Sequence, residues 1–105
     1  MKKTTLFLIT SSAIGLVSAP VFAEEASIEL GQKLFNNPGL GASKNAISCN
    51  ACHAEGEGLE NAGENPNLAA IINKCIIGPL EGEKLDEQTV AMRSLKMYIQ
   101  SLGKK

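Results

Sequence analysis

The chain has 105 residues, enough for one small domain, and its 10 basic and 11 acidic side chains give a formal net charge of −1. Because this balance lacks the basic excess that nucleic-acid phosphates require, we expect no nucleic-acid partner. Three cysteines and a single histidine are the residues in this composition that most often hold metals or cofactors.

Residues 1–23 have the pattern of a secretory signal peptide. Lys2 and Lys3 precede a short apolar run, and compact residues lead to a cleavage site after Ala23. Serines and a glycine interrupt the run, so we expect no stable membrane span after cleavage, an uncleaved anchor being the alternative. The sequence therefore predicts export to the periplasm, with one domain over residues 24–105.

Residues 24–36 form the first predicted helix. Ile28, Gly31 and Phe35 recur at near-helical spacing, and the segment Asn36–Gly39 contains a proline and a glycine that end the pattern. A glycine inside a helix costs up to about 1 kcal/mol relative to alanine, so we expect Gly31 to have a close packing partner.

A polar loop is predicted over residues 39–48, and Cys49-Asn50-Ala51-Cys52-His53 follows it. The spacing Cys-x-x-Cys-His is the covalent attachment motif for haem c. Cys49 and Cys52 would form thioether bonds to the haem vinyl groups, and His53 would be an axial ligand of the iron. A thioredoxin-type redox pair needs a βαβ setting that is absent, and a structural zinc site needs four ligands. We therefore predict one covalent haem c.

A second loop is predicted over residues 54–65, and Asn65-Pro66-Asn67 then gives a helix-entry pattern. The apolar face that begins at Leu68 includes Cys75, and a glycine and a proline end the helix after it. A free cysteine on such a face is most often a small buried hydrophobe, and the alternative is a group that faces the haem.

The last predicted helix has Asp86 as a possible amino cap and an apolar face from Ala91 to Leu102, and Gly103 ends it. No strand alternation occurs in residues 24–105. The sequence therefore predicts an all-α fold.

The chain resembles class I cytochromes c in three segments: Gly31–Phe35, Cys49–His53 and Leu95–Leu102. The resemblance implies a small helical fold wrapped around one covalent haem. It also implies that the terminal helices cross with Gly31 packed against Tyr98, which would give this glycine its close partner.

The usual sixth iron ligand of that family is a methionine before the last helix, and residues 78–86 contain none. A narrower pattern, beginning with Ile72-Asn73-Lys74-Cys75, is similar to haem domains of thiosulfate dehydrogenases and related sulfur-oxidation cytochromes. That resemblance implies Cys75 as the leading candidate for the sixth ligand. Met92 and Met97 are the alternatives.

These features predict a periplasmic one-electron carrier of a respiratory or sulfur-oxidation chain that is not itself an enzyme. Its partners would be redox proteins that donate and accept electrons. Two alternatives belong to other functional classes. One is a haem subunit of an enzyme that acts on inorganic sulfur compounds, and the other is a ligand-binding or sensor haem protein.

Overall fold

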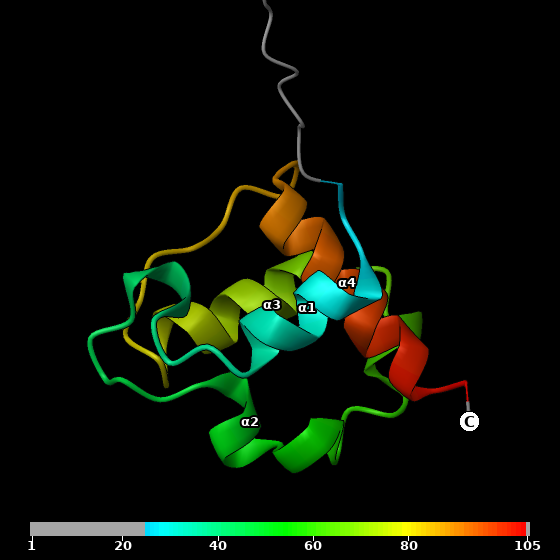
Figure 1. The fold of residues 1–105 in the computed structure, drawn as a ribbon, viewed down its shortest axis with the longest axis horizontal. Helices are drawn as coiled ribbons and strands as arrows, with labels where there is room; N and C mark the ends of the chain where they lie inside the picture. The colour runs from blue at the N-terminus through cyan, green and yellow to red at the C-terminus, as the bar shows by residue number, and fades with distance from the viewer. Residues whose placement is uncertain (1–24, 105) are drawn as a thin grey trace, which may run out of the picture.

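The computed structural model describes residues 25–104, in which helices are joined by turns and longer loops and no strand occurs (Figure 1). The prediction of an all-α fold is confirmed, whereas the predicted signal peptide lies outside the described residues. The α-helices are α1 (Ile28–Phe35), α2 (Cys49–Cys52), α3 (Leu68–Ile77) and α4 (Val90–Leu102). The 3-10 turns are η2 (Leu40–Ala42), η3 (Ala54–Gly56) and η4 (Ala62–Glu64).

Helix α1 begins later than the predicted residue 24 because Ser27 caps it. The Ser27 hydroxyl accepts a hydrogen bond from the Leu30 N–H at 3.0 Å, which satisfies one of the free donors at the start of a helix. Helix α1 ends at Phe35, close to the predicted end.

Helix α4 begins at Val90, and the prediction of Asp86 as its cap is wrong. The hydroxyl of Thr89 accepts the hydrogen bond from the Met92 N–H at 3.1 Å. The Asp86 carboxylate instead accepts from the Gln88 N–H at 2.8 Å and shapes the turn before the helix. The predicted end at Leu102 is confirmed.

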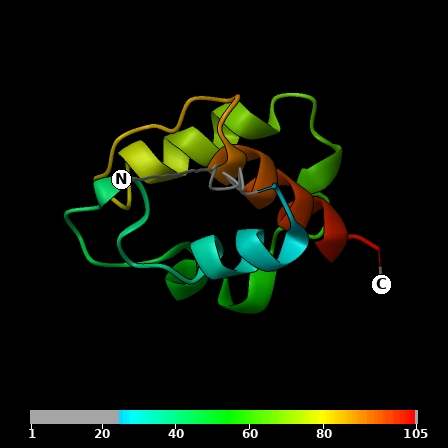
Figure 2. The same ribbon diagram turned by 45° about the horizontal axis from the view of Figure 1, so that its top comes forward.

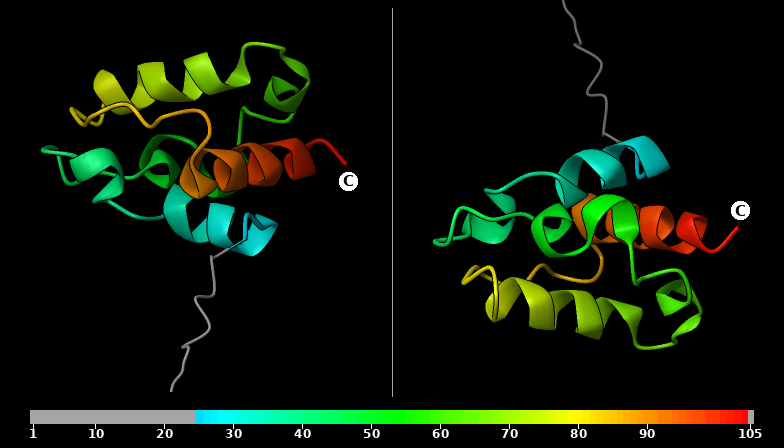
Figure 3. Two further views of the ribbon diagram at one scale, coloured as in Figure 1. Left: turned by 90° about the horizontal axis from the view of Figure 1, so that it is seen from above. Right: turned by 90° about the horizontal axis from the view of Figure 1, so that it is seen from below.

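Helices α1 and α4 pack closely against each other, and α4 lies between α1 and α3 (Figure 3). A Cβ built on Gly31 would lie 2.7 Å from the Tyr98 Cβ, so only glycine allows this approach. The ring centroids of Phe35 and Tyr98 are 5.1 Å apart, which adds an aromatic contact to the crossing. The predicted packing of Gly31 against Tyr98 is confirmed.

The segment after α3 runs back along that helix toward α4 (Figure 2). Asn73, a buried polar residue of α3, fixes its course. The Asn73 side chain donates to the Leu85 carbonyl at 2.9 Å and accepts from the Leu85 N–H at 2.7 Å. The backbone N–H and the carbonyl of Leu85, which is partly buried, therefore both have a hydrogen-bond partner.

The core joins the three longer helices and two loop residues. The buried core residues are Phe35, Leu40, Leu68, Ala69, Ile72, Ile76, Leu80, Met92, Leu95, Tyr98, Ile99 and Leu102.

Among the described residues, none of the helices is long and apolar enough to cross a membrane.

Candidate haem site

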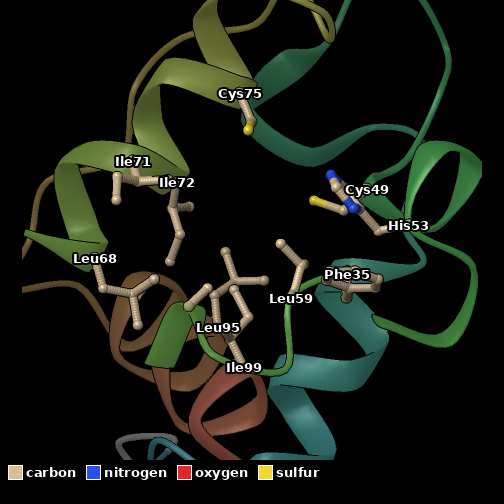
Figure 4. Close-up of a pocket in the computed structure, with 11 residues that line it drawn as sticks. Phe35, Cys49, His53, Leu59, Leu68, Ile71, Ile72, Cys75, Leu95 and Ile99 are labelled. Carbon is tan, nitrogen blue, oxygen red and sulfur yellow. The ribbon is translucent and has the colours of Figure 1, made fainter. Parts of the chain in front are cut away.

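A cavity opens beside this core, and its walls are almost entirely apolar (Figure 4). The lining residues are Phe35, Cys49, His53, Leu59, Ala62, Leu68, Ile71, Ile72, Cys75, Leu95 and Ile99. The cavity therefore brings together one imidazole and two thiols among aliphatic and aromatic side chains.

Cys49 and Cys52 form the two ends of the short helix α2, which the sequence did not reveal as a helix. Residues three apart lie on the same side of a helix, so the motif spacing places both thiols toward one face. Cys49 is half-buried and lines the cavity, whereas Cys52 is exposed. The His53 N–H donates to the Cys49 carbonyl at 2.9 Å and so fixes the backbone where the helix ends.

His53 reaches the cavity from the residue that follows α2, and its ring is held by the next turn. The Nδ1 atom lies 3.0 Å from the carbonyl oxygen of Glu57, which can only accept a hydrogen bond. Nδ1 therefore carries the proton, and Nε2 keeps its lone pair for a metal. The Asn50 side chain supports this turn, because its oxygen accepts from the Glu55 N–H at 2.6 Å.

Cys75 comes from α3, and its sulfur points into the same cavity (Figure 4). The two methionines proposed as alternatives are elsewhere. Met92 is fully buried in the core, Met97 is on the surface with 37% of its area exposed, and neither lines the cavity. Cys75 is therefore the sulfur donor that the fold brings to the cavity beside the Cys-x-x-Cys-His motif.

Burial changes the acidity of the two thiols that line the cavity. Burial, assisted by the nearby Cys75 sulfur, raises the pKa of Cys49 to about 11. Burial also raises the pKa of Cys75, and the Cys52 sulfur adds a smaller effect. Both thiols are therefore protonated at neutral pH when no electrophile or metal is bound, and they share one apolar environment.

These residues fit a covalently attached haem c. The apolar walls suit the porphyrin, the two motif cysteines suit thioether bonds, and the imidazole with its fixed tautomer suits an axial position. Cys75 would supply a thiolate ligand, since its side chain lines the cavity and those of Met92 and Met97 do not.

Sequence patterns missed several lining residues. Leu59 and Ala62 lie in the stretch predicted to be a loop, and both pack against the core and line the cavity. The available indication was Leu59 itself, an isolated leucine between glycines and glutamates. The turns η3 and η4 explain how this polar segment brings two apolar side chains inward.

The comparisons with known proteins identify a matching family. The model of the di-haem cytochrome c peroxidase family matches residues 25–99 of the chain. No curated protein and no solved structure shows a significant match. The match supports the coarser part of the predicted resemblance, a c-type haem protein with a redox role.

The family match also corrects one prediction. We expected a carrier that is not an enzyme, but the matching family is one of cytochrome c peroxidases, which points to peroxidase-type activity. That expectation is wrong because a Cys-x-x-Cys-His motif shows haem attachment and not the reaction that the haem serves. With most of its length matched, the chain belongs to the di-haem cytochrome c peroxidase family.

Proposed function

We propose that the chain is a monohaem c-type domain, exported to the periplasm, that transfers single electrons in a peroxidase-type reaction. Cys49 and Cys52 would hold the haem by thioether bonds, and His53 and Cys75 would be its axial ligands. When bound, haem c supplies an iron that exchanges one electron at a time. Reducing hydrogen peroxide to water consumes two electrons and two protons, so redox proteins that supply electrons are the expected partners.

The observation that carries this proposal is the composition of the cavity. An imidazole with one free nitrogen and a thiol from a different helix enter a cavity that is otherwise apolar. Apolar walls exclude water from the cofactor, and axial ligands from the protein set its potential. Both properties suit electron transfer.

Cys75 determines what else the site can do. A thiolate carries negative charge and stabilises ferric iron, so it would lower the reduction potential relative to a methionine ligand. It would also occupy the position that a peroxide needs. We therefore infer that Cys75 limits the access of peroxide to the site, and that displacing Cys75 would favour the peroxidase-type reaction.

A stopped-flow experiment tests the proposal. The reduced holoprotein is mixed with hydrogen peroxide, and its reoxidation is compared with that of a Cys75→Ala variant. We expect slow reoxidation of the wild type and much faster reoxidation of the variant. In parallel, the wild type should accept electrons readily from a reduced c-type cytochrome.

Met97→Ala is the matched control, because it removes an exposed sulfur that does not line the cavity. It should behave as the wild type in both reactions. Equal and fast peroxide reoxidation of the wild type and Cys75→Ala would contradict the proposal. Cys75 would then not limit the access of peroxide to the site.

A further inference from the structure

Two loops that are far apart in the sequence are joined by hydrogen bonds at one end of the molecule (Figure 3). We call them the clasp: residues 41–45, which lead toward the haem motif, and residues 79–83, which follow α3. The Lys44 N–H donates to the Glu81 carbonyl at 3.2 Å, and the Glu83 N–H donates to the Gly41 carbonyl at 2.7 Å. The clasp therefore ties the segment before Cys49 to the segment after Cys75.

Two side chains complete the clasp. The hydroxyl of Ser43 donates to the Leu80 carbonyl, across 37 residues of sequence. The side-chain amide of Asn45 donates to the Pro79 carbonyl at 2.5 Å, across 34 residues. Both bonds go from the loop before the haem motif to the backbone just beyond α3.

The clasp also reaches Cys75 directly. The Leu80 N–H donates to the Cys75 carbonyl at 3.2 Å, and the Gly82 N–H donates to the Ile76 carbonyl at 2.7 Å. The side chain of Leu80 is buried in the core, with only 3% of its surface exposed, and it holds the loop after α3 in place. Leu80 thus accepts a hydrogen bond from the Ser43 hydroxyl through its carbonyl, and it donates one through its N–H to the backbone of Cys75, the residue that carries the thiol.

The backbones in the clasp are too close for larger residues. Gly41 has a φ of +65°, and a Cβ on it would lie 2.7 Å from the Glu83 carbonyl oxygen. A Cβ on Gly82 would lie 2.8 Å from the Gly41 carbonyl oxygen. These glycines therefore set a short, fixed separation between the two loops.

From these contacts we propose that Ser43 and Asn45 are positioning residues for Cys75. They hold the carboxyl end of α3 against the loop that enters α2, and so keep the Cys75 sulfur in the cavity. Loosening the clasp lets Cys75 withdraw and opens the cavity to external ligands. This inference rests on the proposed role of Cys75 as an axial ligand.

The test is a double-mutant cycle on the holoprotein. Ser43→Ala/Asn45→Ala is made in the wild-type and Cys75→Ala backgrounds. Carbon monoxide binding to the reduced protein, imidazole binding to the oxidised protein and the reduction potential are measured. In the wild-type background the clasp variant should bind both ligands roughly five- to tenfold faster, and its potential should rise. In the Cys75→Ala background it should change nothing further.

Two controls separate positioning from general loss of structure. Asn36→Ala removes an exposed asparagine, whose side chain donates to the Gln32 carbonyl at 2.9 Å outside the clasp, and it should leave ligand binding unchanged. The single variant Ser43→Thr leaves Asn45 unchanged and keeps a hydroxyl that can donate to the Leu80 carbonyl. It should bind carbon monoxide and imidazole at rates close to those of the wild type.

Each other outcome overturns the inference in a recognisable way. If the clasp variant speeds ligand binding equally in both backgrounds, it acts on access or stability and not through Cys75. If it has no effect while Cys75→Ala does, Cys75 is a ligand that the clasp does not position. If Cys75→Ala itself changes nothing, the proposed ligand is wrong, and the inference falls with it.

Discussion

Gly31 lies directly against the backbone of Ser94, and a Cβ built on Gly31 would be 2.1 Å from the Ser94 carbonyl oxygen. The same two helices are joined a turn earlier, where the Ser27 N–H donates to the Ser94 hydroxyl at 3.1 Å. Because Phe35 at the end of α1 lines the cavity, this crossing also fixes one wall of the candidate haem site.

Replacing Gly31 with alanine should destabilise the holoprotein by about 1–3 kcal/mol, because the added methyl group forces α1 and α4 apart. The free energy of unfolding, measured with guanidinium chloride, checks this. Gly39→Ala is the control, since its Cβ would meet no atom closer than 3.3 Å. If Gly31→Ala and Gly39→Ala unfold at the same denaturant concentration, α1 and α4 do not pack as closely at Gly31 as described.

The stability of the holoprotein should depend on Tyr98 at alkaline pH. Burial, with a smaller contribution from Glu55, raises the pKa of Tyr98 above its ordinary value of 10.0. The folded state therefore favours the neutral phenol, and this contribution to stability is constant below pH 10 and lost as the pH rises further.

Urea unfolding across this pH range, in the wild type and Tyr98→Phe, measures that contribution. The variant should lose the part of the pH dependence that comes from the phenol. Tyr98 is the only tyrosine in the chain, so the ultraviolet band of tyrosinate reports its ionisation directly. A band that appears at the ordinary pKa would show that the phenol is not buried.

Asn73→Ala should cost about 1–3 kcal/mol of unfolding free energy, because it leaves the Leu85 N–H and carbonyl without their partner. Asn37→Ala is a suitable comparison, since Asn37 is exposed and accepts a single bond from the Gly39 N–H at 2.8 Å. Thermal unfolding followed by circular dichroism measures both variants. Similar midpoints would mean that the segment after α3 is held by other contacts.

Removing the haem should largely unfold the chain. Without haem, the apolar side chains that line the cavity lose their largest packing partner. Burying one such side chain is worth about 1.5–3 kcal/mol, so the loss of several is on the order of the whole stability of a small domain. A Cys49→Ala/Cys52→Ala variant, which cannot form thioether bonds, should show little helical circular dichroism. Native-like helicity in this variant would show that the polypeptide folds on its own.

Sequence patterns predicted the features that depend on local periodicity or on a fixed motif. The apolar faces of α1, α3 and α4 follow helical spacing. The partner of Gly31 in α4 came from the resemblance to class I cytochromes c and not from periodicity. Helix starts were less predictable. Ser27 and Thr89 are both good amino caps, but acidic residues nearby gave an equally good pattern.

Long-range polar contacts could not be predicted from the sequence. Asn73 bonds to Leu85, and Ser43 bonds to Leu80, through side-chain contacts with distant backbone groups that leave no periodic pattern. The inward position of Leu59 has the same origin, because two short 3-10 turns redirect a segment whose composition is that of a solvated loop.

The central claim is that His53 and Cys75 are the two axial ligands of one haem c. The most direct measurement is the visible, near-infrared and electron paramagnetic resonance spectrum of the ferric holoprotein beside a Cys75→Ala variant. We predict a low-spin thiolate spectrum for the wild type that becomes high-spin in the variant. Unchanged spectra with a methionine-to-iron charge-transfer band would contradict the claim.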